Sequence, residues 1–302
     1  MEVNMNRSEP EMNETKDMTT PIEENEMHEQ KEPFVAEVDE RIPFVCVTNV
    51  KAADISDLSL TFFKGGIHGI LAPKGSGKTL ITDLISGVER PEQGSITVGG
   101  KDLLANPNAA KKKLGYVPQE SVFFDGMTVS ETMNFIGEAR LVPAEKRYRQ
   151  IKEAMDLLGI DGIGKRLIRR LSTAELKRLA IAAALLGNPD LLVMDEPIPQ
   201  NAGEGKQAFL DLIRMLGRIK TIVLATSDIE LARSLCEDVV ILSDGKILAQ
   251  GTFEELDAKL RRNGDGCTLE SIYAQLCAAS REEPLDSDEE NKDEAIEGEN
   301  EA

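Results

Sequence analysis

The chain has 302 residues, a length that allows one large domain or two small ones, and 41% of them are hydrophobic, enough for a packed core. Its net charge of −19 is concentrated at the two ends. Residues 1–40 carry 13 acidic and 3 basic side chains, residues 281–302 carry 11 and 2, and residues 41–280 hold 30 of each. Because acidic segments repel phosphate backbones, this distribution argues against nucleic acid as a partner.

The two ends of the chain are predicted to be disordered tails, at residues 1–40 and 279–302. They hold few aliphatic side chains and neither Trp nor Tyr, so they cannot bury enough surface to offset the entropy lost on ordering. Solubility or spacing is favoured as their role over the binding of a specific partner.

The cysteines and the lengths of the apolar runs indicate the cellular compartment of the protein and whether it crosses a membrane. Four cysteines are scattered without a Cys-x-x-Cys pair, which favours buried thiols in a reducing cytosol over a metal site or a disulfide framework. The first residues lack the apolar core of a signal peptide, and no apolar run approaches the length needed to span a bilayer. If the protein works at a membrane, we expect another chain to cross it.

Strands dominate the first part of the predicted domain. They are expected, in chain order, at 44–50, 55–63 and 66–73, within 94–103, which is predicted as a strand and a turn, and at 113–119. The first two form an antiparallel layer, and the third leads into a glycine-rich turn. The segment after that turn, 80–87, has the apolar spacing of a helix that stops at Gly87.

Helices dominate the next part. They are predicted at 128–141, 144–160 and 173–187, and the first opens with Thr128 and Glu131 at capping-box spacing. Strands at 191–195, 221–226 and 238–251 then alternate with helices at 205–216 and 228–236. This alternation predicts a parallel sheet with helices packed on it.

The stretch "APKGSGKT", residues 72–79, follows a predicted strand and opens a predicted helix, the setting of a Walker A phosphate loop. Gly75 and Gly77 allow a tight turn, and the helix N-terminus adds partial positive charge. We expect Lys78 to reach the β- and γ-phosphates of a nucleotide and the Thr79 hydroxyl to hold Mg²⁺. The alternative is a glycine-rich turn with a chance lysine. The predicted nucleotide-binding residues are Ala72, Pro73, Lys74, Gly75, Ser76, Gly77, Lys78, Thr79 and Leu80.

A second motif supports the first. The apolar run "LLVM" ends in Asp195 and Glu196, and a buried strand that ends in two acids needs a reason, because unpaired buried carboxylates are costly. A nucleotide with Mg²⁺ supplies one. Asp195 is expected to bind the metal or its water, and Glu196 to orient and deprotonate the attacking water.

Together these stretches resemble the ATP-binding subunits of ABC transporters, over about residues 41–278. The resemblance includes "YVPQ", which makes Gln119 the Q-loop glutamine, with a catalytic and metal-binding role, and "TLESIYAQL", similar to the C-terminal piece of exporter subunits. It implies an α/β P-loop NTPase fold with a parallel-sheet core, an N-terminal antiparallel β layer and a small α-helical subdomain at about 120–172. That subdomain is too short for the coiled coils of DNA-repair ATPases.

The resemblance also implies an assembly. In this family two cassettes meet head to tail and trap ATP between the Walker A loop of one and the signature motif of the other. Ser172 of "LSTAE" is therefore expected to contact ATP across a dimer interface. The implied partners are separate transmembrane permease subunits and a second ATP-binding cassette, and the implied location is cytoplasmic, on the inner face of the cell membrane.

The signature motif departs from the family pattern, which resembles LSGGQ. Ser172 keeps its hydroxyl, but the side chains of Thr173 and Ala174 stand where the backbone of two glycines comes close to the nucleotide. Ser172 and Glu175 are also a plain capping box, so the stretch fits a weakened signature and a helix cap equally well.

Three further departures concern the switch, the D-loop and the adenine contact. Ser227 replaces the switch histidine and is too short to hold the γ-phosphate and the Glu196 region together. The loss of one such preorganised contact is expected to lower the rate of hydrolysis about 10²–10³-fold. His68 is expected to be a packed strand residue. The D-loop, 198–202, lacks its aspartate. No aromatic side chain stands where family members stack adenine, because the nearest ring, Phe44, is expected in the core. The missing stacking is expected to weaken binding of the base by about 1 kcal/mol.

The sequence therefore predicts an ATP-binding and ATP-hydrolysing subunit of an ABC transporter, with the cofactors ATP and Mg²⁺ and with weakened hydrolysis. A heterodimer with an intact cassette, or a low-turnover role, accounts for the eroded motifs. The alternative is a pseudo-ATPase whose nucleotide-dependent dimer is regulatory or structural. A soluble ATPase that acts on nucleic acid is disfavoured, because the chain has no basic patch to bind it.

Overall fold

The computed structural model describes residues 41–53, 55–199, 203–262 and 268–282. Residues 1–40 separate from residues 41–302 as a unit of their own and lie outside the described residues, as do residues 283–302. The prediction that both tails are disordered therefore stays a prediction. Helix α9 (Leu269–Glu282) continues past residue 278, where the sequence places the end of the domain.

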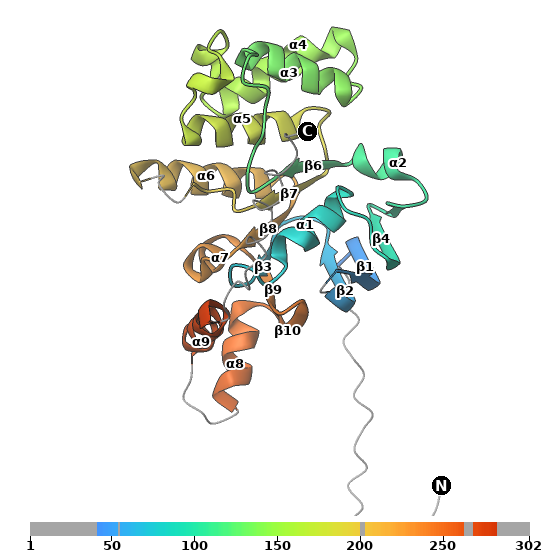
Figure 1. Ribbon diagram of the computed structural model, residues 1–302, viewed down its shortest axis with the longest axis vertical. Coiled ribbons are helices and arrows are strands. Elements are labelled where there is room, and N and C mark those ends of the chain that lie inside the picture. The colour runs from blue at the N-terminus through green and yellow to red at the C-terminus, as the bar shows by residue number, and fades with distance from the viewer. Residues whose placement is uncertain (1–40, 54, 200–202, 263–267, 283–302) are drawn as a thin grey trace, which may run out of the picture. The chain divides into compact units, whose positions relative to one another are not determined.

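A six-stranded sheet lies at the centre of the described residues, as Figure 1 shows. In spatial order its strands are β10 (Lys246–Gly251), β9 (Asp238–Ser243), β3 (Ile67–Leu71), β8 (Thr221–Thr226), β7 (Leu191–Asp195) and β6 (Leu114–Val117). Neighbouring strands from β9 to β6 are parallel, and β10 pairs with β9 as an antiparallel hairpin. The parallel core predicted from strand–helix alternation is confirmed.

A second, antiparallel sheet packs beside the first. Its order is β2 (Ile55–Phe63), β1 (Pro43–Ala52), β4 (Gln93–Val98) and β5 (Lys101–Asp102). Helix α1 (Lys78–Ser86) contacts strands of both sheets, and its buried residues Ile81, Leu84 and Ile85 join their common core. The antiparallel layer predicted from the first strands is therefore present, and it covers the helix that follows the phosphate loop.

The remaining helices belong mostly to a second core, on the other face of the central sheet. They are α2 (Pro107–Lys111), α3 (Val129–Ala139), α4 (Ala144–Leu157), α5 (Thr173–Leu185), α6 (Lys206–Gly217), α7 (Ile229–Leu235) and α8 (Phe253–Arg262), with short 3₁₀ turns at Asp161–Ile163, Ile168–Arg170 and Gly203–Gly205. Helices α2 and α8 were not predicted. No helix in the described ranges is long and apolar enough to cross a bilayer.

The helical block is tied to the central sheet by Arg140, which follows α3. Its guanidinium donates to the carbonyl oxygens of Leu186, at 2.6 Å, and Leu114, at 2.8 Å. The block begins with the predicted capping box, in which the Thr128 hydroxyl accepts from the Glu131 amide and the Glu131 carboxylate accepts from the Thr128 amide. These contacts orient α3 and α5 over the edge strand β6.

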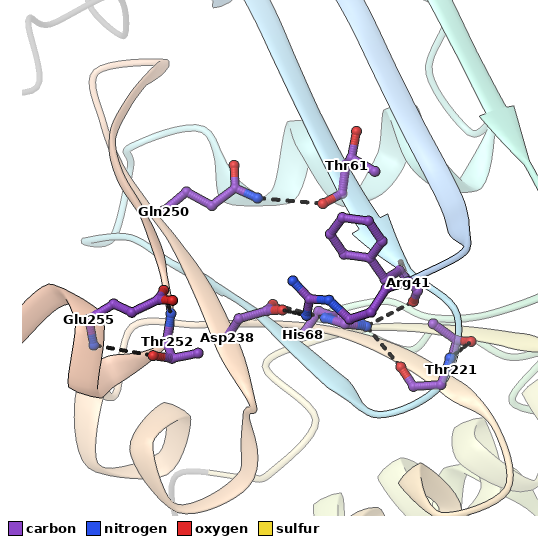
Figure 2. A network of polar contacts seen from close by, with 10 residues as sticks. Arg41, Thr61, His68, Thr221, Asp238, Gln250, Thr252 and Glu255 are labelled. Atoms are coloured by element: carbon purple, nitrogen blue, oxygen red, sulfur yellow. Dashed lines mark hydrogen bonds and ion pairs between the residues drawn. The ribbon is translucent and has the colours of Figure 1, made fainter. Parts of the chain in front are cut away.

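His68 joins the two sheets through a buried polar network, drawn in Figure 2. It is 1% exposed on β3, as expected of a packed strand residue. Its Nδ1 lies 2.8 Å from Asp238, and its Nε2 lies 2.9 Å from the carbonyl oxygens of Phe63 and Gly65. Burial opposes a charge on the ring, but the hydrogen bond and charge of Asp238 outweigh it and raise the pKa of His68. The ring is therefore fixed between acceptors on both sides.

Candidate nucleotide site

The phosphate loop connects β3 to α1 and has the backbone that its glycines permit. Gly75 and Gly77 both have φ of 85°, in the left-handed region that side chains disfavour. A Cβ at Gly75 would meet nothing within 4 Å, so glycine is needed there for conformation and not for space. Ala72 is fully buried and its φ is not positive, so the backbone at this position does not require glycine.

Lys78 opens helix α1 with its side chain almost fully buried. Its ammonium lies 3.5 Å from the carbonyl oxygen of Pro73 and 3.6 Å from Glu196 Oε1. Gly77 stands at the N-cap without a side-chain hydrogen bond, so the first amides of the helix are left for a ligand. A buried ammonium and a helix N-terminus thus direct positive charge at the same side of the phosphate loop, an arrangement that favours binding of phosphate.

The carboxyl end of β7 lies against this loop. The Thr79 hydroxyl donates to Asp195 Oδ2 at 2.7 Å. Asp195 is fully buried, and its other oxygen, Oδ1, has no hydrogen-bond partner. Burial raises the pKa of Asp195, although the Thr79 hydrogen bond and the Lys78 charge oppose the rise. A buried carboxylate oxygen without a partner is costly, and a bound cation offsets that cost.

The donor set fits Mg²⁺. Thr79, Asp195 and Gln119 offer a hydroxyl, a carboxylate and an amide oxygen, the hard ligands this ion prefers. The described part of the chain holds no group of three or more His, Cys, Asp or Glu side chains that could hold a metal alone.

Glu196 follows β7 in a strained conformation, with φ of 43°. Its Oε2 accepts from the Thr226 hydroxyl at 3.1 Å, and its Oε1 accepts from the Ser227 amide at 2.8 Å and the Ser227 hydroxyl at 2.9 Å. Ser227 therefore holds Glu196, because it supplies its backbone amide as well as its hydroxyl to the carboxylate. The expectation that serine is too short to hold the γ-phosphate together with the Glu196 region stays a prediction.

These groups border a cleft of about 770 Å³. Its walls are Lys74, Gly75, Gly77, Lys78, Thr79, Gln119, Glu120, Thr173, Lys177, Glu196, Ile198 and Pro199. The other predicted loop residues, Ala72, Pro73 and Ser76, are buried, and Leu80 is half-buried on α1. The structure therefore brings Lys78 and Thr79 of the phosphate loop to one cleft with Gln119 and Glu196.

The signature helix start is held by its own side chains. The Ser172 hydroxyl caps the Glu175 amide at 3.3 Å and donates to Glu175 Oε2 at 2.9 Å, and Arg166 pairs with the same carboxylate at 2.6 Å. The Ser172 backbone amide and Arg166 lower the pKa of Glu175, although burial opposes this, so the carboxylate stays charged. The capping box is confirmed, and the contact of Ser172 with ATP across a dimer stays a prediction.

Sequence reasoning missed Lys177, which links α5 to the Q-loop. Its ammonium donates to the carbonyl oxygens of Pro118, at 3.0 Å, and Gln119, at 2.9 Å. The side chain lines the cleft and is buried, and this burial lowers the pKa of Lys177. The sequence gives one sign of this contact, a lysine in a predicted helix that becomes apolar toward its end. A lysine exposed to solvent would give the same pattern.

The remaining departures have different outcomes. Phe44 is 6% exposed in the core, as expected, and no aromatic side chain lines the cleft among the described residues. Ile198 and Pro199 line the cleft, whereas residues 200–202 of the predicted D-loop lie outside the described residues.

Comparison with known proteins agrees with this geometry. The sequence model of the ABC transporter family matches residues 55–199. The lipopolysaccharide export system ATP-binding protein LptB of Haemophilus influenzae is 33% identical over 69% of this chain and 89% of its own length. The sulfate/thiosulfate import ATP-binding protein CysA of Synechocystis is 31% identical over 67% of this chain, which spans 57% of that relative.

Other relatives are longer still: the chain spans 24% of the ABC transporter A family member 1 of Dictyostelium discoideum, at 29% identity. Among solved structures, an ATP-binding subunit of an ABC transporter superposes with a TM-score of 0.67 at 20% identity, covering 77% of this chain and 99% of that one, which shows the fold. From the match to almost the whole of LptB, the chain belongs to the ABC transporter family, among its ATP-binding proteins.

Proposed function

We propose that this chain binds ATP with Mg²⁺, hydrolyses it, and couples the cycle to separate membrane-spanning subunits through a dimer of cassettes. The observation that carries the proposal is the convergence of Lys78, Thr79 and Glu196 on one cleft, above the buried carboxylate of Asp195. Phosphate binding rests on charge and backbone donors, which this chain keeps. The relatives named for lipopolysaccharide export and sulfate import support a role in transport.

The residues of the cleft divide the chemistry among them. Lys78 and the amides at the start of α1 bind the β- and γ-phosphates. Thr79, Asp195 and Gln119 would hold Mg²⁺, which neutralises phosphate charge when bound. Glu196 orients water for attack on the γ-phosphate and accepts its proton. The carboxylate must give up part of its contact with Ser227 or Thr226 to take up that water, because both of its oxygens are already engaged.

A groove of about 220 Å³ beside the Q-loop supports docking of a membrane-spanning partner. It is lined mainly by apolar and aromatic side chains between β6 and the helical block, among them Tyr116, Phe123 and Ile136. Val122, which lines the groove, is 89% exposed, and Phe124, two residues further along the chain, is 63% exposed. Exposed apolar side chains around a groove are typical of a protein interface. We propose that a helix of the permease subunit fits here and holds the chain at the inner face of the membrane.

We propose that hydrolysis is weak when two copies of this chain pair. Each site would then receive a signature with Thr173 and Ala174 in place of glycines, and a switch without histidine. A partner cassette with an intact signature would complete the site better, so a heterodimer is favoured. The exporter-like C-terminal stretch 268–276 favours export as the direction of transport.

A second candidate is a pseudo-ATPase that binds nucleotide for a regulatory or structural purpose. The observation that favours it is the engagement of Glu196 by Ser227, Thr226 and Lys78, which leaves the carboxylate committed to its own chain. Retention of Glu196 itself favours hydrolysis.

Steady-state ATPase assays of the purified full chain, with ATP binding measured by calorimetry, distinguish the two candidates. The proposal predicts slow turnover that Glu196→Gln lowers about 100-fold or more with binding retained, as expected for a general base. Glu120→Gln, a change of the same kind on the cleft wall, is the control and should leave turnover within a few-fold. Binding without turnover in the wild type would favour the pseudo-ATPase, and absence of binding would refute both.

A further inference from the structure

The C-terminal helix α9 contacts the switch segment directly. Tyr273, on the inner face of α9, is 3% exposed, and its hydroxyl donates to the carbonyl oxygen of Ser227 at 3.1 Å. Burial raises the pKa of Tyr273, and Cys277 and the charges of Glu196 and Asp228 raise it further, so the hydroxyl keeps its proton and acts as a donor. A residue from the end of the domain thus reaches the loop beside the cleft.

Ser227 is held on both of its peptide groups. Its carbonyl accepts from Tyr273, while its amide and hydroxyl donate to Glu196 Oε1. These contacts restrain the two peptide groups on either side of the Ser227 Cα, one from α9 and one from the cleft. Tyr273, Ser227 and Glu196 therefore form a continuous chain of hydrogen bonds from α9 to the cleft.

Helix α9 is itself anchored to the helix that follows the switch (Figure 1). Arg233 of α7 pairs with Asp257 of α8 at 3.2 Å and with Glu270 of α9, and its guanidinium lies 4.7 Å from the centroid of the Phe253 ring. Because α7 begins just after Ser227, one arginine fixes the C-terminal helices relative to the switch. The Tyr273 contact therefore belongs to a rigid arrangement of side chains.

We propose that Tyr273 is a positioning residue for Glu196, acting through the backbone of Ser227. The inference rests on the proposed role of Glu196 as the base that activates water. In a chain whose switch carries serine, the tyrosine hydroxyl keeps the Ser227 amide directed at the carboxylate and so keeps the carboxylate over the cleft. Tyr273 touches neither nucleotide nor water; its effect passes through Ser227.

The test is Tyr273→Phe in the full chain, which removes the hydroxyl and keeps the buried ring. Tyr148→Phe is the matched control, because Tyr148 is 78% exposed. Loss of one hydrogen bond of about 0.5–1.5 kcal/mol predicts a 2- to 10-fold fall in kcat with KM for ATP unchanged. Amide hydrogen exchange at Ser227, measured without nucleotide, should become faster in Tyr273→Phe by a similar factor and stay unchanged in Tyr148→Phe.

A double variant tests the route. If Tyr273 affects turnover by positioning Glu196, Tyr273→Phe should lower kcat less in a Glu196→Gln background than in the wild type. Unchanged exchange at Ser227, or a change in KM with kcat constant, would overturn the inference. If the wild type has no measurable turnover, the proposed hydrolysis fails, whereas the exchange measurement still decides whether Tyr273 holds the switch.

Discussion

The phosphate loop and the start of the signature helix satisfy their polar groups in opposite ways. At the loop, Asp195 keeps a buried oxygen without a partner, and Lys78 is buried with its charge directed into the cleft. At the helix start, Ser172 and Glu175 satisfy each other, and Arg166 neutralises the carboxylate. A buried group left unsatisfied indicates a place for a ligand, whereas groups that satisfy one another stabilise the fold without one. The comparison favours a chain that retains nucleotide binding and has a weakened signature.

The largest effect is expected at the unsatisfied carboxylate. Asp195→Asn removes a charge that burial disfavours, so without nucleotide the melting temperature should rise, by about 2–4 °C for 1 kcal/mol. The same variant should lose the Mg²⁺ dependence of ATP binding, because the metal loses an anionic ligand. Thermal unfolding with and without ATP and Mg²⁺ measures both effects. A lower melting temperature without nucleotide, together with normal Mg²⁺ dependence, would mean that Asp195 is structural.

At the start of the signature helix, substitution should instead lower stability and raise turnover. Replacing Thr173 and Ala174 by glycine removes the steric obstacle and should raise ATP turnover several-fold, at a cost of about 1–2 kcal/mol in helix stability. Glycines at Ala144 and Glu145, at the start of α4, are the matched control, which should lower stability without raising turnover. Turnover that falls in the signature variant in proportion to its stability would mean that the helix start is only a cap.

The smallest effect concerns the His68 network, away from both regions. The pKa of His68 is raised above its ordinary value of 6.5, so its stabilising contribution is complete below pH 6.5 and is lost as pH rises through the folded-state pKa. Denaturant unfolding between pH 6 and 9 should show the free energy of unfolding decline over this range. His68→Gln should flatten this decline. An equal decline in the variant would assign the pH dependence to other groups.

The strands and the phosphate loop could be predicted because their signals are local. Apolar strand runs, the spacing of Gly75, Gly77 and Lys78, and two acids after β7 each indicate a structure within a few residues. Helix α8 was missed because its apolar residues stand among many charges. The contact between Ser227 and Glu196 was missed because it depends on a strained backbone at Glu196, and the Tyr273 contact because it joins residues far apart in the sequence.

Calorimetry of ATP binding to the full chain, with and without Mg²⁺, tests the convergence of Lys78, Asp195 and Glu196 most directly. The account predicts one site per chain whose affinity Lys78→Met lowers about 10- to 100-fold, the loss of a charged hydrogen bond or two. Lys101→Met, at an exposed lysine on the antiparallel sheet, should bind as the wild type does. No heat of binding in the wild type, or equal binding by the Lys78 and Lys101 variants, would contradict the account.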